Sequence, residues 1–171
     1  MVIWLIGISG AGKTTLGNRL KEYLDRSGKK SFIIDGDVVR DFFENDLGYT
    51  IEERVANIKR IMLAAQVLSL NGIVTVVCNI SPFESLREFA RRKIKDYNEI
   101  YLKRDLELSR KNDVKGMYGA HSGKTEIIGI DLKFDEPMHS DLVLNTGHES
   151  IDESLLKLIS YLKTRYPGGH F

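Results

Sequence analysis

The sequence has only one cysteine among 171 residues, and the lack of a second thiol excludes an intramolecular disulfide. Cys78 ends the apolar run 73–77, so we expect a buried, inert strand residue there and not a nucleophile. Apolar runs long enough to cross a membrane are also lacking. The N-terminal segment has no basic region before its apolar residues, unlike a signal peptide. These absences predict a cytoplasmic protein that makes no membrane contact.

An excess of charge of one sign is lacking as well. Lys plus Arg number 25 and Asp plus Glu number 24, a balance that argues against a nucleic-acid polymer as partner. The basic cluster 91–93 is interpreted as a solvated helix face. No metal-ligand spacing joins the four histidines, which are His121, His139, His148 and His170. Apolar residues make up 42% of the chain, which suits a single packed domain over residues 1–171.

Short apolar runs alternate with helical patterns along the chain. They are apolar on both faces, as in a parallel sheet covered by helices, and they comprise Val2–Ile6, Ser31–Ile34, Ile73–Cys78, Glu99–Leu102 and Asp141–Leu144. Capping boxes, in which Ser or Thr is followed three residues later by Glu, predict helix starts at Thr50/Glu53, Ser81/Glu84 and Ser150/Glu153. The alternation predicts a three-layer α/β fold, in which a five-stranded parallel sheet carries helices on both faces.

The stretch at about 111–137 differs from the rest of the chain. It shows little periodicity and holds several glycines, namely Gly116, Gly119, Gly123 and Gly129. A long irregular segment inside a compact domain is usually a functional lid or a mobile loop. We therefore expect a mobile lid here, with a passive surface insertion as the alternative.

Residues 7–14 read GISGAGKT and match the phosphate-loop pattern GxxxxGK[ST] between an apolar strand and a helix. Such a loop turns backbone N–H groups inward around phosphate oxygens, and the helix N-terminus adds its positive end. Lys13 can reach the β- and γ-phosphates, and the Thr14 hydroxyl can ligate Mg²⁺. The predicted ATP phosphate-binding residues are Gly7, Ser9, Gly10, Ala11, Gly12, Lys13, Thr14 and Thr15. This pattern predicts a P-loop nucleoside-triphosphate hydrolase or kinase fold. No Asn-Lys-x-Asp guanine signature occurs and the chain is short, so a small-molecule kinase is favoured over a GTPase or an ATPase motor.

A second candidate site follows the strand that ends near residue 34. Asp35 and Asp37 come at the strand edge where ligands bind in open α/β sheets. Either carboxylate can hold magnesium-bound water or accept the proton of an acceptor hydroxyl, and Arg40 can fork onto a phosphate. The alternative is a helix N-cap with a surface charge pair. The catalytic candidates are Lys13, Asp35 and Asp37.

Several segments occur in the order in which one kinase family carries them: GISGAGKTT at 7–15, DGDVVR at 35–40, DLGY at 46–49, RVANIKR at 54–60, ISPF at 80–83, KGMY at 115–118, GID at 129–131 and DLVLNT at 141–146. Through them the chain resembles the adenylylsulfate (APS) kinases, which phosphorylate the 3′-hydroxyl of a nucleotide ester. The resemblance implies ATP as co-substrate, Mg²⁺ as cofactor and commonly a homodimer. It implies that Tyr49 stacks on the acceptor base, and that the acceptor is bound by Asp37, Arg40, Tyr49, Arg54, Asn57, Ile80 and Ser81.

The chain departs from the family pattern at two places. Asn112 stands where the family has an arginine that packs on the ATP adenine, and the candidates for the ATP base are Arg110, Asn112 and Thr146. The family's lid reads Lys-x-Phe-Thr-Gly-Ile-Asp, whereas residues 125–131 read TEIIGID. Lys124 is adjacent to the position of the missing lysine, and Ile127 stands where the second base-stacking aromatic should be. Lys124 and Ile127 are therefore further acceptor-binding candidates.

The lid departures lead us to predict a nucleotide 3′-kinase with an acceptor other than adenylyl sulfate. Family relatives linked to capsule or other surface polysaccharides accept cytidine diphosphoramidate, and a pyrimidine suits a pocket with one aromatic wall. An authentic adenylylsulfate kinase of sulfate assimilation is the alternative within the family. Outside it, a kinase for a sugar acid or a similar metabolite and a non-catalytic ATP-binding regulatory domain remain open, and the latter would bind ATP without turnover.

Overall fold

The structure is a computed structural model of the chain that describes residues 1–111 and 126–168, with the side chains of residues 110 and 111 left aside. Its elements follow one another as β1 (Val2–Ile6), α1 (Lys13–Arg26), β2 (Ser31–Asp35), α2 (Gly36–Phe42), α3 (Ile51–Leu70), β3 (Val74–Cys78), α4 (Glu84–Lys93), β4 (Tyr97–Leu102), α5 (Leu106–Lys111), β5 (Leu142–Leu144) and α6 (Ile151–Arg165). The strands lie within a residue or two of the apolar runs that predicted them.

The five strands form one sheet in the order β2-β3-β1-β4-β5, and every neighbouring pair is parallel. Strand β1 is the central strand, with β3 and β2 on one side and β4 and β5 on the other. Ligands of open α/β sheets bind beyond the carboxyl ends of the strands, where the order reverses. The phosphate loop leaves β1 at this point.

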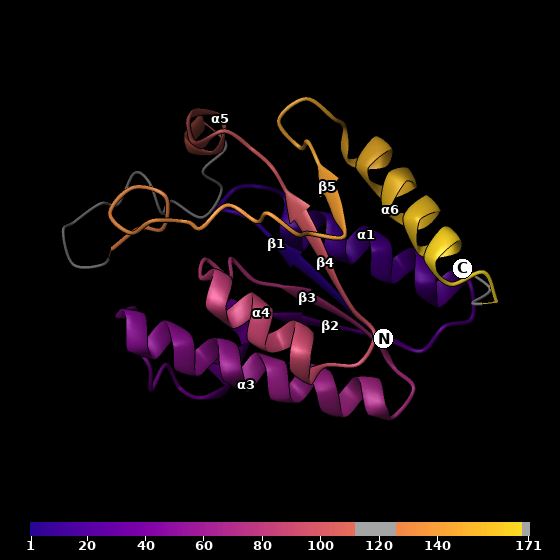
Figure 1. Cartoon of the computed structure of the whole chain (residues 1–171), viewed down its shortest axis with the longest axis horizontal. Helices are drawn as coiled ribbons and strands as arrows, with labels where there is room; N and C mark the ends of the chain where they lie inside the picture. Colours follow the sequence, from indigo (N-terminus) through magenta and orange to yellow (C-terminus); the bar gives the residue numbers. More distant parts are fainter. Residues whose placement is uncertain (112–125, 169–171) are drawn as a thin grey trace.

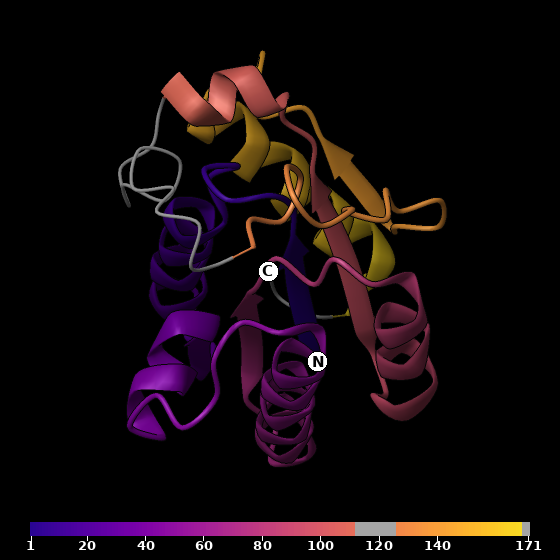
Figure 2. The same ribbon diagram turned by 90° about the vertical axis from the view of Figure 1, so that its left-hand side faces the viewer.

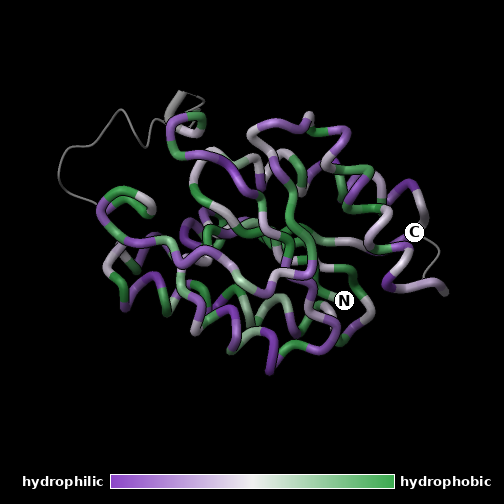
Figure 3. Tube along the Cα trace, turned by 45° about the horizontal axis from the view of Figure 1, so that its top comes forward, coloured by the Kyte–Doolittle hydropathy of each residue, from purple (hydrophilic) through white to green (hydrophobic). Residues whose placement is uncertain are grey.

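Helices cover both faces of the sheet and enclose two cores (Figure 1). Along β1, Ile3 and Leu5 pack in one core with α1 and α6, whereas Val2, Trp4 and Ile6 pack in the other with α3 and α4. This alternation is the period-two side-chain pattern of a strand. The central strands are accordingly green in Figure 3, while the helices alternate between hydrophobic and hydrophilic residues. The predicted three-layer α/β architecture is confirmed.

Two of the three predicted capping boxes are present, at Thr50 with Glu53 and at Ser150 with Glu153. The third prediction, Ser81 with Glu84, is wrong, because α4 begins at Glu84 with Phe83 as its N-cap. The Ser81 hydroxyl instead accepts the Trp4 indole N–H at 2.8 Å and donates to the Asn79 side chain at 3.0 Å. These tertiary contacts outweigh the local capping pattern.

The segment that leads into β5 passes close to the phosphate loop. A side chain at Gly129 would have its Cβ atom 3.6 Å from a methyl group of Ile8. Figure 2 shows this orange segment beside the indigo loop that follows β1. A tight turn forms here, since the carbonyl of Ile127 accepts backbone N–H groups from residues 130, 131 and 132. Within the described part of the chain, no helix combines the length and apolar character needed to cross a membrane.

Candidate active site

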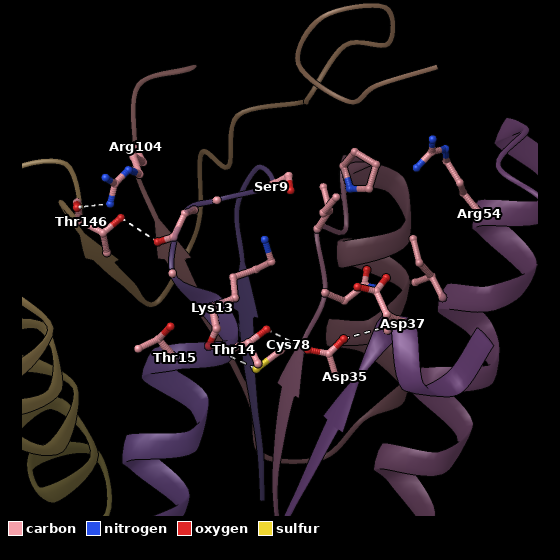
Figure 4. A pocket seen from close by; sticks show the side chains of 18 of the residues that line it. Ser9, Lys13, Thr14, Thr15, Asp35, Asp37, Arg54, Cys78, Arg104 and Thr146 are labelled. Carbon is pink, nitrogen blue, oxygen red and sulfur yellow. Dashed lines mark hydrogen bonds between the residues drawn. The ribbon is translucent and has the colours of Figure 1, made fainter. Parts of the chain in front are cut away.

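A cavity of about 850 Å³ opens at the carboxyl edge of the sheet. The phosphate loop crosses its middle, and the residues that end or follow the neighbouring strands form its two sides (Figure 4). On the β2 and β3 side lie Asp35, Asp37, Arg40, Tyr49, Arg54, Asn57, Asn79, Ile80 and Pro82. On the β4 and β5 side lie Arg104, Thr146, Glu149, Ile151 and Ser154. The cavity therefore joins both candidate sites that the sequence predicted.

The phosphate loop depends on glycine where the chain turns. Gly7 has φ 147°, and a Cβ atom there would lie 2.6 Å from the carbonyl oxygen of Leu102. Gly12 has φ 93° and is the N-cap of α1. Left-handed backbone of this kind costs glycine little and other residues more. Among the predicted phosphate-binding residues, those at 9–15 line the cavity, while Gly7 shapes the loop beneath it.

Lys13, the first residue of α1, folds back over the loop. Its Nζ donates to the carbonyl oxygens of Gly7 at 2.8 Å and Ile8 at 2.7 Å. The ammonium group therefore lies above the loop in the middle of the cavity, as Figure 4 shows. A positive charge in this position can stabilise negative charge that develops on a transferring phosphoryl group.

The hydroxyl of Thr14 donates to the Asp35 carboxylate at 2.8 Å. The two residues come from α1 and β2, and both line the cavity beside the phosphate loop. Mg²⁺ prefers oxygen ligands and is usually held by one or two carboxylates together with substrate phosphates. This pair of hard oxygen donors next to a phosphate loop fits such an ion. The described residues contain no cluster of three or more His, Cys, Asp or Glu that could hold a metal by themselves.

The two carboxylates of the 35–37 segment have different surroundings. Asp35 is the N-cap of α2, and its Oδ1 accepts the backbone N–H of Asp37 at 3.0 Å. The helix N-cap, which was the alternative reading of this segment, is therefore observed at Asp35, and the same residue lines the cavity. Asp37 is exposed in the first turn of α2 and lines the same cavity without being the cap. Its carboxylate can receive a proton from a bound hydroxyl.

A cluster of Arg40, Tyr49 and Arg54 closes the far side of the cavity. The guanidinium carbons of Arg40 and Arg54 lie 4.5 and 5.2 Å from the centre of the Tyr49 ring. Arg40 Nη1 also donates to the carbonyls of Leu47 and Gly48, at 2.9 and 2.6 Å. Burial, followed by the positive charge of Arg40, lowers the pKa of the Arg54 guanidinium. This site holds two cations against one ring, as an anionic ligand with an aromatic part would require.

Arg54 also links this cluster to the segment that begins at Glu126. Its Nε donates to the carbonyl of Tyr49 at 2.7 Å, and its Nη2 donates to the carbonyl of Glu126 at 2.6 Å. One helical turn further, Asn57 is buried and donates to the carbonyl of Gly36 at 3.4 Å. Among the described residues, none pairs with Asn57 Oδ1, although the residue lines the cavity. This oxygen can accept a hydrogen bond from a bound hydroxyl or amine.

The 79–82 segment forms a wall of the cavity through Asn79, Ile80 and Pro82. Ser81 does not line the cavity, because its side chain is buried toward Trp4 and its backbone has φ 47°. The resemblance implies a contact between the backbone of residues 80–83 and the sugar of the acceptor, and this contact stays a prediction. The Ser81 side chain, through its bonds to Trp4 and Asn79, supports the shape of the wall on which Ile80 is presented.

A buried charged cluster supports this wall from behind. Arg87, which is 1% exposed, donates to the carbonyls of Ser81 at 2.8 Å and Asp135 at 2.7 Å, and it pairs with Glu84. Its Nε lies 3.8 Å from a carboxylate oxygen of Glu99, which is buried in β4. Burial raises the pKa of the Glu99 carboxyl, and the charges of Arg91 and Arg87 act in the opposite direction. Local sequence patterns do not reveal this cluster, because the segments that contain Arg87, Glu99 and Asp135 are separate in the chain.

Ile127 was predicted to stand at the acceptor base, but the structure places it elsewhere. Its side chain is 5% exposed and it is not one of the residues that line the cavity. Its backbone N–H donates to the Asp131 carboxylate at 2.7 Å, so it belongs to the turn. Among the residues of this region that the structure describes, Glu126 contacts Arg54 through its carbonyl. Of the other predictions in this region, Asn112, Lys124 and the Arg110 side chain lie outside the described residues.

Thr146, predicted near the ATP base, lines the β5 side of the cavity. Its hydroxyl donates to the carbonyl of Ala11 at 2.9 Å and therefore fastens the loop after β5 to the phosphate loop. Its own carbonyl accepts Arg104 Nη1 at 3.0 Å. Sequence reasoning missed Arg104. The signal that could have found it is its place just after β4, at the carboxyl edge of the sheet.

The sheet has the strand order of a P-loop kinase, and the phosphate loop follows its central strand. Asp35 and Asp37 lie at the carboxyl end of β2, the next strand in the chain. Together these features place the chain in the class of P-loop kinases. Shikimate kinase from Acinetobacter baumannii has the same fold, with a TM-score of 0.61 at 15% identity over 96% of this chain and 93% of its own. At that identity the likeness extends to the fold alone. The predicted P-loop fold is confirmed.

The particular family follows from closer matches. The family model for adenylylsulphate kinase matches residues 1–145, so the chain belongs to this family. An adenylyl-sulfate kinase from Halothermothrix orenii is 37% identical over 167 residues, which cover 96% of this chain and 90% of that protein. The APS kinase of Mycobacterium tuberculosis, solved in complex with AMPPNP and APS, has a TM-score of 0.88 at 31% identity, over 95% of this chain and 96% of its own. The chain is accordingly a phosphotransferase with an alcohol group as acceptor.

Proposed function

We propose that the chain transfers the γ-phosphate of ATP to the 3′-hydroxyl of a nucleotide 5′-ester, and that this ester is adenylyl sulfate. The observation that carries the proposal is the single cavity in which Lys13 lies over the phosphate loop and Asp37 stands across from it. The family match supports the same reaction, because the relatives reported above are kinases named for adenylyl sulfate.

In the proposed reaction the bond between the γ-phosphorus and the bridging oxygen of ATP breaks, and a bond from the acceptor 3′-oxygen forms. The proton of the 3′-hydroxyl passes to the Asp37 carboxylate, which also orients the oxygen for attack. Lys13 stabilises the charge on the transferring group. Thr14 and Asp35 would hold Mg²⁺, which would further neutralise that charge.

The Arg40, Tyr49 and Arg54 cluster is the proposed acceptor site. Its two guanidinium groups can pair with the anionic part of a nucleotide ester, and Tyr49 can contact the base. Asn57 Oδ1, which is buried on the cavity wall, can accept a hydrogen bond from the acceptor. The Ile80 and Pro82 wall then lies along the sugar.

A cytidine 5′-ester such as cytidine diphosphoramidate is a second candidate for the acceptor. The specific observation in its favour is that Ile127 is not aromatic and does not line the cavity, so the acceptor base has one aromatic wall among the described residues. The relatives named above do not support this acceptor. We therefore put adenylyl sulfate first.

The test is a coupled ATP-consumption assay of the purified chain with adenylyl sulfate, cytidine diphosphoramidate and simple nucleotides, in which ³¹P NMR assigns the phosphorylated position. We expect turnover with adenylyl sulfate and a 3′-phosphate in the product. A higher kcat/KM with the cytidine ester would favour the second candidate. ATP binding without turnover on any acceptor would overturn the proposal in favour of a regulatory domain, and turnover on a sugar acid alone would overturn the nucleotide acceptor.

A further inference from the structure

The two sides of the cavity suggest where the nucleoside of the phosphate donor lies. This step rests on the proposed function, in which the phosphate chain of ATP lies on the loop after β1. Asp35, Asp37 and the arginine cluster occupy the β2 and β3 side, where the acceptor is proposed to bind. The nucleoside of ATP extends away from its transferred phosphate, so it must lie on the opposite side, beyond β4 and β5.

Arg104 is the cationic side chain that lines the cavity on that opposite side, among the residues that the structure describes. It follows β4 directly, and Figure 4 shows it next to Thr146 and across the phosphate loop from Arg54. Its neighbours on the cavity wall are Thr146, Glu149 and Ile151, which include one apolar surface and two polar ones. Such a mixture suits a ribose and a base better than a chain of phosphates.

The guanidinium of Arg104 is linked to the phosphate loop through Thr146. Its Nη1 donates to the Thr146 carbonyl at 3.0 Å, while the Thr146 hydroxyl donates to the carbonyls of Ala11 at 2.9 Å and Lys103 at 3.3 Å. A chain of hydrogen bonds therefore runs from the guanidinium to the loop that would hold the phosphates. A flat group held in this way is preorganised, so less freedom is lost when a ligand packs against it.

One atom of this guanidinium has no partner. Arg104 Nε is buried, and the described residues offer it no hydrogen-bond acceptor. Buried donors in folded proteins are nearly always satisfied, so each exception calls for an explanation. Because this atom is covered by the protein, a ligand in the cavity meets the rest of the guanidinium, and a flat guanidinium packs well on an aromatic ring.

We propose that Arg104 binds the base of the donor nucleotide, with its guanidinium plane against the ring. This assigns a residue for the donor base in a chain where Asn112 stands at the position of the arginine expected from the family. Arg104 acts on binding and on the choice of donor base, and it takes no part in the transfer of the phosphate.

The test compares Arg104→Met, which keeps the length of the side chain, and Arg104→Lys, which keeps the charge but loses the plane. Lys103→Met is the matched control, because Lys103 is an exposed neighbour that pairs with Glu136 and does not line the cavity. Calorimetry would measure binding of Mg·ATP and of inorganic tripolyphosphate, which has the phosphates but no base. Thermal melting would verify that each variant is folded.

For Arg104→Met we expect Kd for ATP to rise about tenfold, the size of a desolvated cation–π contact, with binding of tripolyphosphate unaffected. Arg104→Lys should lose most of the same factor, and Lys103→Met should resemble the parent. An equal loss for tripolyphosphate, full retention by Arg104→Lys, or no loss with either variant would overturn the base contact. If the parent binds ATP but phosphorylates no acceptor, the proposed function fails while the base contact stands. If the parent binds no ATP, both are wrong.

Discussion

Two parts of the active-site cavity are built in different ways: the phosphate loop in its middle, called the phosphate side below, and the proposed acceptor site by β2 and β3, called the acceptor side. The phosphate side comes from one short segment at 7–15, where backbone atoms and Lys13 form the surface. The acceptor side is assembled from residues of α2, α3, the 79–82 wall and the 126–132 turn. Its contacts span long stretches of chain, since Arg54 and Glu126 are 72 residues apart and Trp4 and Ser81 are 77 apart.

This contrast separates the properties that P-loop kinases share from those that belong to an individual chain. A loop that binds through its backbone can be carried by any P-loop kinase, because it needs only glycines and one lysine. An acceptor site made from side chains on several elements can change its ligand when one element changes. Variants on the phosphate side should therefore affect all acceptors equally, whereas variants on the acceptor side should discriminate between them.

Asp37→Asn should have the largest effect, a loss of roughly two to four orders of magnitude in kcat if the carboxylate takes the acceptor proton. Folding should survive, because Asp35 and not Asp37 caps α2. Steady-state kinetics with the preferred acceptor would measure the loss, and Asp41→Asn on the same helix is the control. Rescue by excess Mg²⁺ would instead indicate a metal role for Asp37. An unchanged kcat would contradict both roles.

Arg87→Met tests the support behind the acceptor wall. The variant leaves Glu99 buried without one of its two arginines and leaves the carbonyls of Ser81 and Asp135 without their donor. Removing one partner of a buried ion pair typically costs about 3–5 kcal/mol of unfolding free energy. Urea denaturation would measure this loss, with the exposed Arg92→Met as control. A difference below about 1 kcal/mol, as for an exposed ion pair, would show that the cluster contributes little to the fold.

Lys13→Ala should lower kcat on the order of a hundredfold, the usual effect of removing one electrostatic donor to the transition state. Because Lys13 lies on the phosphate side, the factor should be the same for every acceptor that the chain turns over. Turnover assays with two acceptors would measure both factors. The control is Lys21→Ala, because Lys21 lies on the same helix, pairs with Asp25 and does not line the cavity. Factors that differ strongly between acceptors would break the division between the two sides.

The place of residues 9–15 along the cavity could be predicted from the sequence, because the determinants of the loop are adjacent in the chain. The same holds for the place of Asp35 and Asp37 on the cavity wall, for the strands, and for the capping boxes at Thr50 and Ser150. The prediction failed at Ser81, whose conformation is imposed by Trp4 from the central strand.

Two further residues show the same limit. Ile127 was assigned to the acceptor base by its position in a motif, but the turn that contains it directs its side chain into a buried position. Arg104 carries no motif, and its neighbourhood with Thr146 arises only because β4 and β5 are paired in the sheet. Contacts of this kind follow from the packing of distant segments, which a local pattern does not encode.

Ile127→Phe is the variant for which we expect the smallest change in kinetics, and it tests the identity of the acceptor. A base–aromatic stack is worth about 1–3 kcal/mol, and isoleucine keeps part of the apolar contact, so a gain near tenfold is the most that one added ring should bring. If this position approaches the acceptor when it binds, the variant should raise the ratio of kcat/KM for adenylyl sulfate to that for a cytidine ester, since a purine offers the larger face. Competition assays with both acceptors in one mixture would measure the ratio directly. Ile127→Leu is the control for altered packing, because it changes shape without adding a ring.

The structure also provides the opposing expectation for Ile127→Phe. The side chain is buried away from the cavity, so the larger phenylalanine ring should strain the turn at 127–132 and lower the stability of the protein while leaving the kcat/KM ratio unchanged. A shifted ratio at constant melting temperature would assign the position to acceptor selection, and a lowered melting temperature with a constant ratio would assign it to the turn alone.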